Sequence, residues 1–340
     1  MIFMSKRILA AACAAATALA LSACSSTPSS EGNATKDGTL TVMASFYPLQ
    51  YLAEKIGGEH VTVTSLTPAG AEPHDLELSP KTVDALASAD AVVYLAGFQA
   101  AVDEAIEQQA PKTVIDVSPA AELVEANSSA NHPSEDEDAD EAQSGESATE
   151  EHADHDHEGH DHEGHHHDMS ADPHFWLDPV RMASAATLVG DKLAEADPAN
   201  ADTYKANAKA LNEELSALGD DLVAKTATCQ IKTFVTAHTA FGYLADRTGL
   251  TQVGISGLDP DSSPSPARLA KIGQIAKDQG VTTIFTEALI DPKVAQTLAD
   301  DLGISTAVLD PIESQTDSSK DYAAVMKDNI NALTTANNCQ

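Results

Sequence analysis

Short apolar runs alternate with amphipathic helical patterns along most of the 340-residue chain. The apolar runs are rich in Val, Ile and Thr, which is typical of β-strands. They lie at 40–44, 61–66, 91–95 and 113–117, and again at 233–237, 252–255, 282–285 and 306–309. Helical patterns, such as 80–89 and 266–277, lie between them. This alternation indicates βαβ units, so we expect an α/β fold with two (βα) lobes and mainly parallel sheets.

Two neighbouring helical segments interrupt this alternation. Asp178-Pro179 and Asp197-Pro198 each supply an N-cap residue and a first-turn proline, so we expect a helix to begin at each. The second helix has one apolar stripe, which consists of Tyr204, Leu211, Leu215, Leu218 and Leu222. A helix of about 28 residues is about 40 Å long and can connect two lobes. We therefore expect an N-terminal lobe at 39–196, a connecting helix at 197–228 and a C-terminal lobe at 229–340.

The start of the chain has the pattern of an export signal. Lys6 and Arg7 precede an apolar run at 8–21, and no later stretch reaches the roughly 20 apolar residues that span a bilayer. The run ends in Leu21-Ser-Ala-Cys24, which resembles a bacterial lipobox and implies cleavage before Cys24 and lipidation of its sulfur. A plain signal cleaved nearby is the alternative. We expect a signal peptide at 1–23, a flexible tether at 24–38, and an extracytoplasmic protein anchored to the cell membrane.

Two cysteines remain when Cys13 leaves with the signal and Cys24 is lipidated. Cys229 and Cys339 are a disulfide candidate, because an even pair in an oxidising compartment tends to be bonded. The bond would close about 110 residues and contribute about 4–5 kcal/mol in the chain-entropy model. Two unpaired thiols are the alternative, since the sequence does not show that the two Cα atoms approach.

The charge balance excludes one class of partner. Nineteen Lys and Arg stand against 53 Asp and Glu, which gives a net charge of −34. Such a surface repels the phosphates of nucleic acids, and it suits a cation as ligand. The imbalance is greatest between Lys112 and Arg181, where there is no Lys or Arg.

Within that stretch lies an acidic, His-rich segment, which we place at 127–171. Residues 132–168 contain nine of the thirteen histidines and fifteen acidic residues, with almost no large apolar side chains, so we expect a disordered insertion in the first lobe. Its candidate secondary metal ligands are His152, His155, His157, His160, His162, His165, His166 and His167. They could collect zinc or sense its supply, a role that would weaken as pH falls through the histidine titration range. The alternative is a solvated acidic loop with no essential role.

The remaining candidate residues lie at predicted strand ends. His238 directly follows strand 233–237, Glu313 follows strand 306–309, and His74 ends the loop after strand 61–66. His174 lies just ahead of the helix at Pro179. Ligands of open α/β sheets bind outside the carboxyl ends of the strands, so this set suggests a metal site. Singly, each residue has an ordinary interpretation, as a surface histidine or a first-turn acid. Together they include every histidine outside the acidic segment except His60.

Five motifs carry a family resemblance. They are Pro73-His74-Asp-Leu-Glu-Leu-Ser-Pro80, Asp172-Pro-His-Phe-Trp-Leu-Asp-Pro179, Ala237-His238-Thr-Ala-Phe-Gly-Tyr-Leu244, Ile255-Ser-Gly-Leu-Asp-Pro-Asp261 and Leu309-Asp-Pro-Ile-Glu-Ser314. In this order they resemble the cluster A-I metal-binding solute-binding lipoproteins of ABC transporters, in the zinc-type ZnuA/AdcA branch. The resemblance runs from about residue 40 to the C-terminus, interrupted by the acidic segment, which is itself common in that branch.

The resemblance implies two (βα) lobes joined by a long rigid helix, with a metal site in the interlobe cleft. Carried over residue by residue, the ligands would be His74, His174, His238 and Glu313. Branches of the family differ at the fourth position, where Asp310 or a water could replace Glu313, and Glu72 is a further candidate. The implied partners are an ABC permease and its ATPase, and we expect a monomer.

The donor types indicate the metal. Three imidazoles and one carboxylate suit tetrahedral Zn²⁺, whereas Mn²⁺ prefers more oxygen ligands and Cu(I) prefers sulfur. Manganese binders of the resembling family carry a carboxylate where His238 stands. Cu²⁺, Ni²⁺ or Co²⁺ could still bind in vitro.

We therefore expect a receptor that captures Zn²⁺ for an ABC permease and is not an enzyme. The alternatives are a receptor for Mn²⁺ or another divalent metal, a zinc-dependent hydrolase, and a metal buffer or adhesin. Three histidines near a glutamate can form a catalytic zinc site. However, the chain has no His-Glu-x-x-His motif, and a fourth protein ligand would fill the open position.

Overall fold

The computed structural model describes residues 39–125 and 171–340. The predicted signal peptide and tether, including Cys24, and the histidines from His152 to His167 lie outside the described residues. Among the described helices, none combines the length and the apolar character needed to cross a bilayer.

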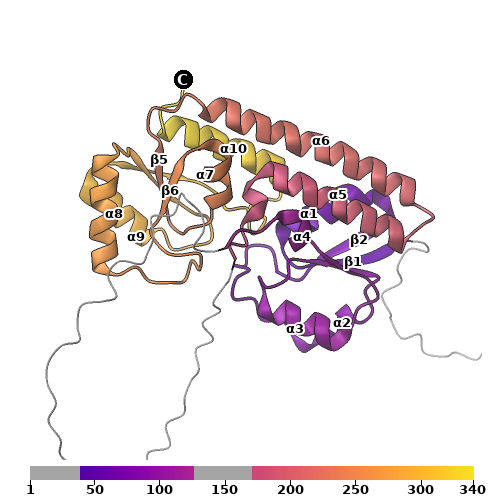
Figure 1. Cartoon of the computed structure of the whole chain (residues 1–340). Helices are drawn as coiled ribbons and strands as arrows, with labels where there is room; N and C mark the ends of the chain where they lie inside the picture. Colours follow the sequence, from indigo (N-terminus) through magenta and orange to yellow (C-terminus); the bar gives the residue numbers. More distant parts are fainter. Residues whose placement is uncertain (1–38, 126–170) are drawn as a thin grey trace, which may run out of the picture. The chain divides into compact units, whose positions relative to one another are not determined.

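The first lobe is built on a parallel four-stranded sheet with the order β2-β1-β3-β4. Its strands are β1 (Leu40–Ala44), β2 (Val61–Ser65), β3 (Ala91–Tyr94) and β4 (Val114–Asp116). Its helices are α1 (Tyr47–Gly57), the 3₁₀ helix η1 (Gly58–His60), α2 (Pro80–Leu86), α3 (Ala100–Gln109) and α4 (Ser118–Ala121). Successive side chains of β1 alternate between two hydrophobic clusters: Val42 packs on the α1 side, and Met43 packs on the side of α2 and α3. Figure 1 shows α1 on one side of β1, and α2 and α3 on the other.

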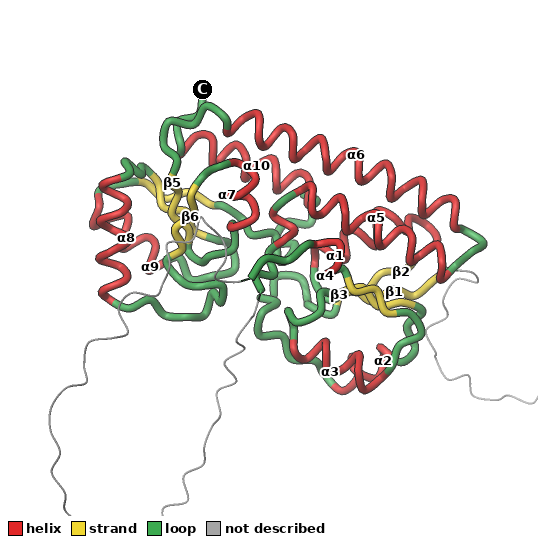
Figure 2. The backbone as a smooth tube through the Cα atoms, in the orientation of Figure 1, coloured by secondary structure: helices red, strands yellow, loops and turns green. Residues whose placement is uncertain are grey.

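The second lobe repeats this plan. Its parallel sheet has the order β6-β5-β7-β8. The strands are β5 (Thr233–Thr236), β6 (Thr251–Gly254), β7 (Thr283–Thr286) and β8 (Ser305–Val308). The helices are α7 (Gly242–Thr248), α8 (Pro266–Asp278), α9 (Lys293–Leu302) and α10 (Tyr322–Ala336). Figure 2 shows helices flanking the strands in both lobes. The prediction of two α/β lobes with parallel sheets is therefore confirmed.

A pair of long helices links the lobes. The 3₁₀ helix η2 (Phe175–Leu177) leads into α5 (Pro179–Ala196), and α6 (Ala201–Thr226) follows. The predicted N-cap Asp178 accepts a hydrogen bond from the N–H of Val180 at 2.9 Å. Helix α6 contacts α1 in the first lobe and α10 in the second, and Figure 1 shows it running alongside α5. Gly190 permits the close approach of α5 and α6, because a Cβ there would lie 2.3 Å from the Cβ of Ala208.

Helix α6 begins later than the sequence pattern predicted. Asp197 does not cap it: its Oδ2 accepts from Asn200 at 2.7 Å and from the Tyr204 hydroxyl at 2.9 Å. These bonds stabilise a turn ahead of the helix, and the first helical residue is Ala201. The apolar stripe that follows is buried as expected.

One hydrophobic cluster extends across both lobes. A single cluster of buried side chains includes Phe46 of the first lobe, Trp176 of η2 and Phe241 of the second lobe. Arg247 of α7 donates to both carboxylate oxygens of Asp178 at 2.9 and 2.7 Å.

Cys229 and Cys339 form a disulfide bond that joins the end of α6 to the segment after α10.

Candidate metal centre

The structure brings four of the predicted side chains to one place, at the carboxyl ends of both sheets. His74 lies in the loop between β2 and α2, and His174 lies immediately before η2. His238 follows β5, and Glu313 lies in the loop between β8 and α10. The second sheet reverses its strand order between β5 and β7, which is where ligands of open α/β sheets bind. His238 stands at that reversal.

The four donor atoms lie within 4.8 Å of one another, and three of them surround Glu313 Oε1. Glu313 Oε1 lies 3.3 Å from His174 Nε2, 3.3 Å from His238 Nε2 and 3.5 Å from His74 Nε2. The Nε2 atoms of His174 and His238 are 3.4 Å apart. A tetrahedral zinc ion with bonds of about 2.0–2.1 Å separates its ligands by about 3.3–3.4 Å. The side chains are at most 6% exposed, so the donors are held away from solvent.

Two of the histidine rings are each backed by a buried carboxylate. Asp172 Oδ1 lies 2.8 Å from His174 Nδ1 and also accepts the His174 backbone N–H at 3.0 Å. Glu287 Oε2 lies 2.7 Å from His238 Nδ1, and its Oε1 accepts the His238 backbone N–H at 3.0 Å. A carboxylate only accepts, so each Nδ1 carries a proton, and loss of the second ring proton leaves an Nε2 lone pair directed to the centre.

His74 is held differently. Its backbone N–H donates to Glu72 Oε2 at 2.9 Å, and its ring packs edge-on against Phe98 with the centroids 4.9 Å apart. Gln99 holds the preceding carbonyl, that of Pro73, at 3.0 Å. In residues 39–125 and 171–340 no carboxylate hydrogen-bonds the His74 ring; Glu72 Oε1 is 3.9 Å from its Nε2.

The charges of the cluster stabilise one another. Burial lowers the pKa of His238, but Glu287 and Glu313 outweigh burial and raise the pKa to about 10. Burial also lowers the pKa of His174, and Asp172 and Glu313 likewise raise it above its usual value. Burial raises the pKa of Glu313, yet its three histidine neighbours hold that pKa well below the usual range. A metal ion entering this cluster competes with protons for the imidazoles.

Two buried atoms at the centre have no hydrogen-bond partner among the described residues: His74 Nε2 and Glu313 Oε1. Buried polar atoms are normally paired, so unpaired donors that face one another suit a bound cation. His74, His174, His238 and Glu313 can all contribute one ligand atom, with these atoms within 4.8 Å of one another.

The other candidates for the fourth position lie elsewhere. The carboxylate of Asp310 accepts the backbone N–H of Ile312 at 2.8 Å and is outside the donor cluster. The carboxylate of Glu72 accepts the backbone N–H of His74 and so holds the loop that carries His74. The sequence analysis missed the roles of Asp172 and Glu287. A signal existed for both: Asp172 lies two residues before His174 in the same motif, and Glu287 directly follows β7.

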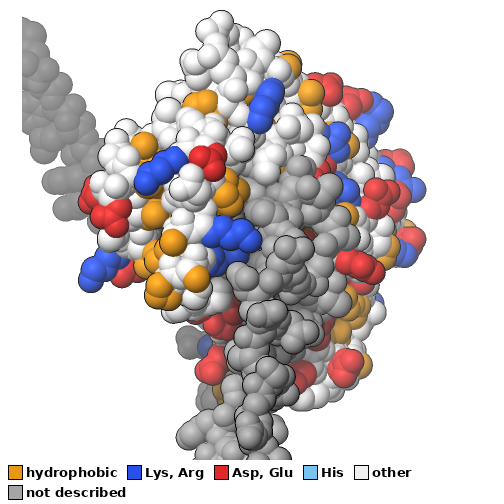
Figure 3. All heavy atoms as spheres, turned by 60° about the vertical axis from the view of Figure 1, so that its left-hand side comes forward, with side chains coloured by type: hydrophobic (Ala, Val, Ile, Leu, Met, Phe, Trp, Pro, Cys, Tyr) orange, Lys and Arg blue, Asp and Glu red, His pale blue; other side chains and the backbone are white. Residues whose placement is uncertain are grey.

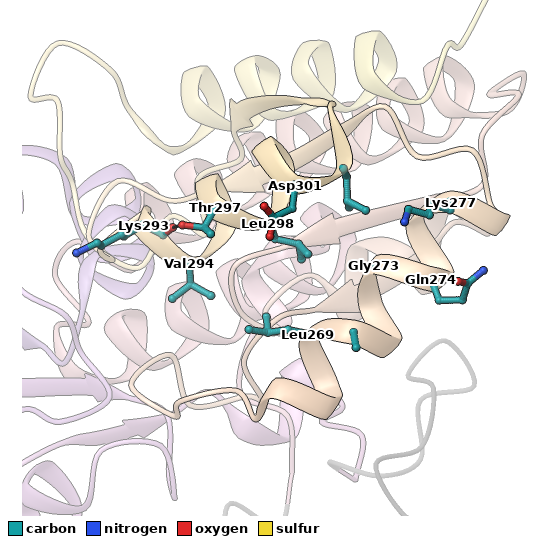
Figure 4. Close-up of a pocket in the computed structure, with 11 residues that line it drawn as sticks. Leu269, Gly273, Gln274, Lys277, Lys293, Val294, Thr297, Leu298 and Asp301 are labelled. Atoms are coloured by element: carbon teal, nitrogen blue, oxygen red, sulfur yellow. Dashed lines mark hydrogen bonds between the residues drawn. The ribbon is translucent and has the colours of Figure 1, made fainter.

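Two of the cavities outside the donor cluster lie against the second lobe. An apolar groove of about 630 Å³ between α8 and α9 is lined by Leu269, Val294 and Leu298, with Lys277 and Lys293 at its rim (Figure 4). Figure 3 shows hydrophobic side chains beside Lys and Arg side chains on that side of the molecule. A smaller cavity of about 270 Å³ is lined by Glu72 and by Ala237, the residue before His238. None of the four donor residues lines the groove, whereas the smaller cavity reaches Glu72 and the residue before His238.

Comparison with known proteins agrees with this description. The family model described as "Zinc-uptake complex component A periplasmic" matches residues 42–336. The high-affinity zinc uptake system protein ZnuA of Bacillus subtilis is 33% identical, over 94% of this chain and 94% of its own length. The zinc-binding protein AdcA of Streptococcus pyogenes is 34% identical over 87% of this chain. The solved Zn(II)-bound ZnuA-like domain of Streptococcus pneumoniae AdcA is 29% identical, with a TM-score of 0.67 over 88% of this chain and 99% of that chain.

The fold and the donor cluster thus define a two-lobed binding protein with a metal centre between its lobes. The chain belongs to the ZnuA family of zinc-uptake components, as the resemblance of its motifs indicated. It spans 56% of the length of the AdcA relative from Streptococcus pyogenes.

Proposed function

We propose that this protein is an extracytoplasmic receptor that captures Zn²⁺ and delivers it to an ABC permease. The observation that carries the proposal is the geometry of the donors, with His74, His174, His238 and Glu313 as the ligands. Their separations of 3.3–3.5 Å about Glu313 Oε1 match the edges of a tetrahedral zinc site. Zn²⁺ is the cargo of such a receptor.

The donor set favours zinc over manganese. Three imidazoles with one carboxylate oxygen form a nitrogen-rich site, whereas Mn²⁺ prefers a shell with more oxygen. The carboxylates behind His174 and His238 make these rings better ligands for zinc. The names of the relatives, which refer to zinc binding and zinc uptake, support the same metal.

A binding role fits the site better than a hydrolytic one. A catalytic zinc site keeps one position open for water or substrate. Here Glu313, which is 2% exposed, would supply a fourth protein donor at the remaining tetrahedral corner. Membership in a family of transport receptors supports the same conclusion.

The location and partners follow from this role. A lipid on Cys24 would anchor the receptor to the cell membrane, and the tether at 24–38 would let it reach a membrane permease. The relative from Streptococcus pneumoniae is named a zinc-binding lipoprotein, which supports the anchor. The permease and its ATPase are the partners, and the receptor acts as a monomer.

The acidic segment would supply weaker, secondary metal sites through the histidines from His152 to His167. Deletion of residues 132–168 removes nine histidines and none of the four proposed ligands. The deletion protein should keep one tight zinc and lose only weak, pH-sensitive sites, as measured by equilibrium dialysis at neutral and mildly acidic pH. Loss of the tight zinc from a folded deletion protein would mean that this segment supplies a primary ligand.

The test of the main proposal is metal titration of the protein after removal of bound metal. In competition with a chelator, Zn²⁺ should bind tightly at one equivalent, and Mn²⁺ should bind far more weakly. Tighter binding of Mn²⁺ would favour a manganese receptor. Hydrolase activity that appears only in the zinc-loaded protein would favour an enzyme.

A further inference from the structure

The turn that presents Glu313 contains a residue in an unusual backbone conformation. Ile312 has a φ of 58°, in the left-handed region, and is 1% exposed. A β-branched residue avoids this region because its side chain crowds the backbone. Contacts from elsewhere must therefore hold the turn. Strain of this kind is concentrated at functional sites.

Hydrogen bonds fix the backbone on the N-terminal side of Ile312. Asp310 Oδ1 accepts the Ile312 N–H at 2.8 Å. Asn329 of α10 accepts the Asp310 N–H at 2.9 Å and donates to the Asp310 carbonyl at 2.6 Å. Trp176 Nε1 donates to the Pro311 carbonyl at 2.7 Å. Asn329 and Trp176 are buried, so water does not compete for these bonds.

The held turn determines where Glu313 lies. Its Oε1 is at nearly equal distances, 3.3–3.5 Å, from three imidazole nitrogens. On the far side of the turn, the Ser314 hydroxyl accepts the Gly70 N–H from the first lobe at 2.7 Å. Asp310 therefore contacts the backbone of the turn and does not contact the donor atoms.

We propose that Asp310 is a positioning residue of the metal site: it holds the left-handed turn at Ile312, and the turn fixes Glu313 at the fourth tetrahedral corner. This inference rests on the proposed function, because it assumes that the four donors bind one Zn²⁺. The inference also gives the turn a role in the choice between metal ions. A carboxylate fixed to offer one oxygen favours four-coordinate zinc. A loosened Glu313 could offer both oxygens and admit metals that prefer higher coordination, such as Mn²⁺.

The experiment compares Asp310→Ala with the conservative variant Asp310→Asn in the full chain. Asn keeps an oxygen at the position of Oδ1 and can still accept the Ile312 N–H, but it lacks the charge of a metal-binding carboxylate. Asp310→Ala should weaken Zn²⁺ binding about 10- to 100-fold, in the range of residues that orient metal ligands. Asp310→Asn should restore most of that affinity.

The visible absorption of bound Co²⁺ distinguishes a loss of Glu313 positioning from a general loss of structure. Co²⁺ absorbs visible light more strongly in four-coordinate than in six-coordinate sites. The Co²⁺-loaded Asp310→Ala protein should therefore absorb less than the unaltered chain, with Asp310→Asn close to the unaltered chain. Zinc affinity in Asp310→Ala equal to that of the unaltered chain would overturn the proposal. So would a loss in Asp310→Asn as large as that in Asp310→Ala, since that would indicate a direct or purely electrostatic role.

A second variant tests the turn itself, after thermal unfolding has shown that it folds despite the loss of a buried side chain. Glycine adopts positive φ without a steric penalty, so the turn of the Ile312→Gly variant can form without the hydrogen bond to Asp310. Added to Ile312→Gly, the Asp310→Ala change should weaken zinc binding less than it does in the unaltered chain. Equal losses in both backgrounds would overturn the proposal. Failure of the unaltered chain to bind one zinc tightly would overturn the proposed function instead, and this inference with it.

Discussion

The two lobes bring their histidines to the metal centre in different ways. The second lobe supplies His238 directly after a strand, with its ring and backbone N–H both bonded to Glu287. The first lobe supplies His74 on a long loop, where Glu72 bonds only to the backbone N–H. His174, beside η2, is backed by Asp172 in the same manner as His238. The rings of His174 and His238 are thus oriented before metal binds, whereas the ring of His74 is oriented less strictly than these two.

This difference has an energetic consequence. A ligand whose ring is already fixed loses little conformational freedom on binding, so more of its coordination energy contributes to affinity. A ligand fixed only by its backbone must also order its ring. We therefore expect the C-terminal lobe to contribute more to zinc affinity than the loop of the N-terminal lobe, although both supply an imidazole.

The largest expected effect is the loss of a fixed ligand. His238→Ala should weaken Zn²⁺ binding about 100- to 1000-fold, which is one ligand's share of the binding free energy of a tetrahedral zinc site. His74→Ala should also remove tight binding, but with a loss about tenfold smaller. Calorimetry with a competing chelator measures both. His60→Ala is the matched control, since His60 packs against Tyr204 away from the donors. Equal losses at the two positions would remove the distinction between the lobes.

The next effect concerns the carboxylates behind the ligands. Glu287→Ala should weaken zinc binding about 10- to 100-fold, because the His238 ring loses its orienting partner. Glu72→Ala should cost less, since Glu72 bonds only to backbone N–H groups near His74. The two affinities are compared by chelator competition, after thermal unfolding has shown that both variants fold. A greater loss in Glu72→Ala would indicate that Glu72 itself binds the metal.

Proton release gives a third test. In the metal-free site the pKa of His238 is raised to about 10, so the ring is protonated at pH 7 and zinc must displace that proton. The affinity for zinc should therefore fall as pH falls, by about tenfold per pH unit for each proton displaced. Calorimetry in two buffers of different ionisation enthalpy counts the protons. Glu287→Ala should release fewer, because the main carboxylate that raises this pKa is gone. Binding at pH 7 without proton release would contradict this account.

The smallest effect is optical. Trp176 is the only tryptophan in the sequence, and its ring centroid lies 5.2 Å from that of His174. Its Nε1 also donates to Pro311, two residues before Glu313. Zinc binding should change its fluorescence and reach an end point at one equivalent. Emission that does not respond to zinc would count against His174 as a ligand.

Much of the fold could be predicted from local pattern. Every strand end lies within one residue of its predicted position, because buried parallel strands need short apolar runs that stand out against amphipathic helices. The start of α6 could not be predicted in this way. The Asp197-Pro198 pair is a common helix start, but bonds to Asn200 and Tyr204 satisfy Asp197 ahead of the helix.

The site was predictable only in part, for a similar reason. His74, His174 and His238 stand at strand ends or in motifs, and the topology brings them together. We propose Glu313 over Asp310 because the structure brings only Glu313 into the donor cluster, from a turn whose left-handed Ile312 no local rule predicts for a β-branched residue. Glu287 reaches His238 across 49 positions of sequence, so its role appears only when β5 and β7 are paired.

One further feature lies where the acidic segment leaves and rejoins the fold. Glu125 and Ala171 form an antiparallel bridge, and the Asp172 N–H donates to the Val124 carbonyl at 3.0 Å. The Tyr243 hydroxyl ties both ends to the second lobe, by accepting from Val124 and donating to Asp172. The chain therefore leaves and rejoins the fold at adjacent positions. An insertion site whose two ends are bonded to each other tolerates inserts of different length without rearrangement of the surrounding structure. We therefore expect the fold to tolerate changes in the length of the sequence between residues 125 and 171 as long as this bridge is kept.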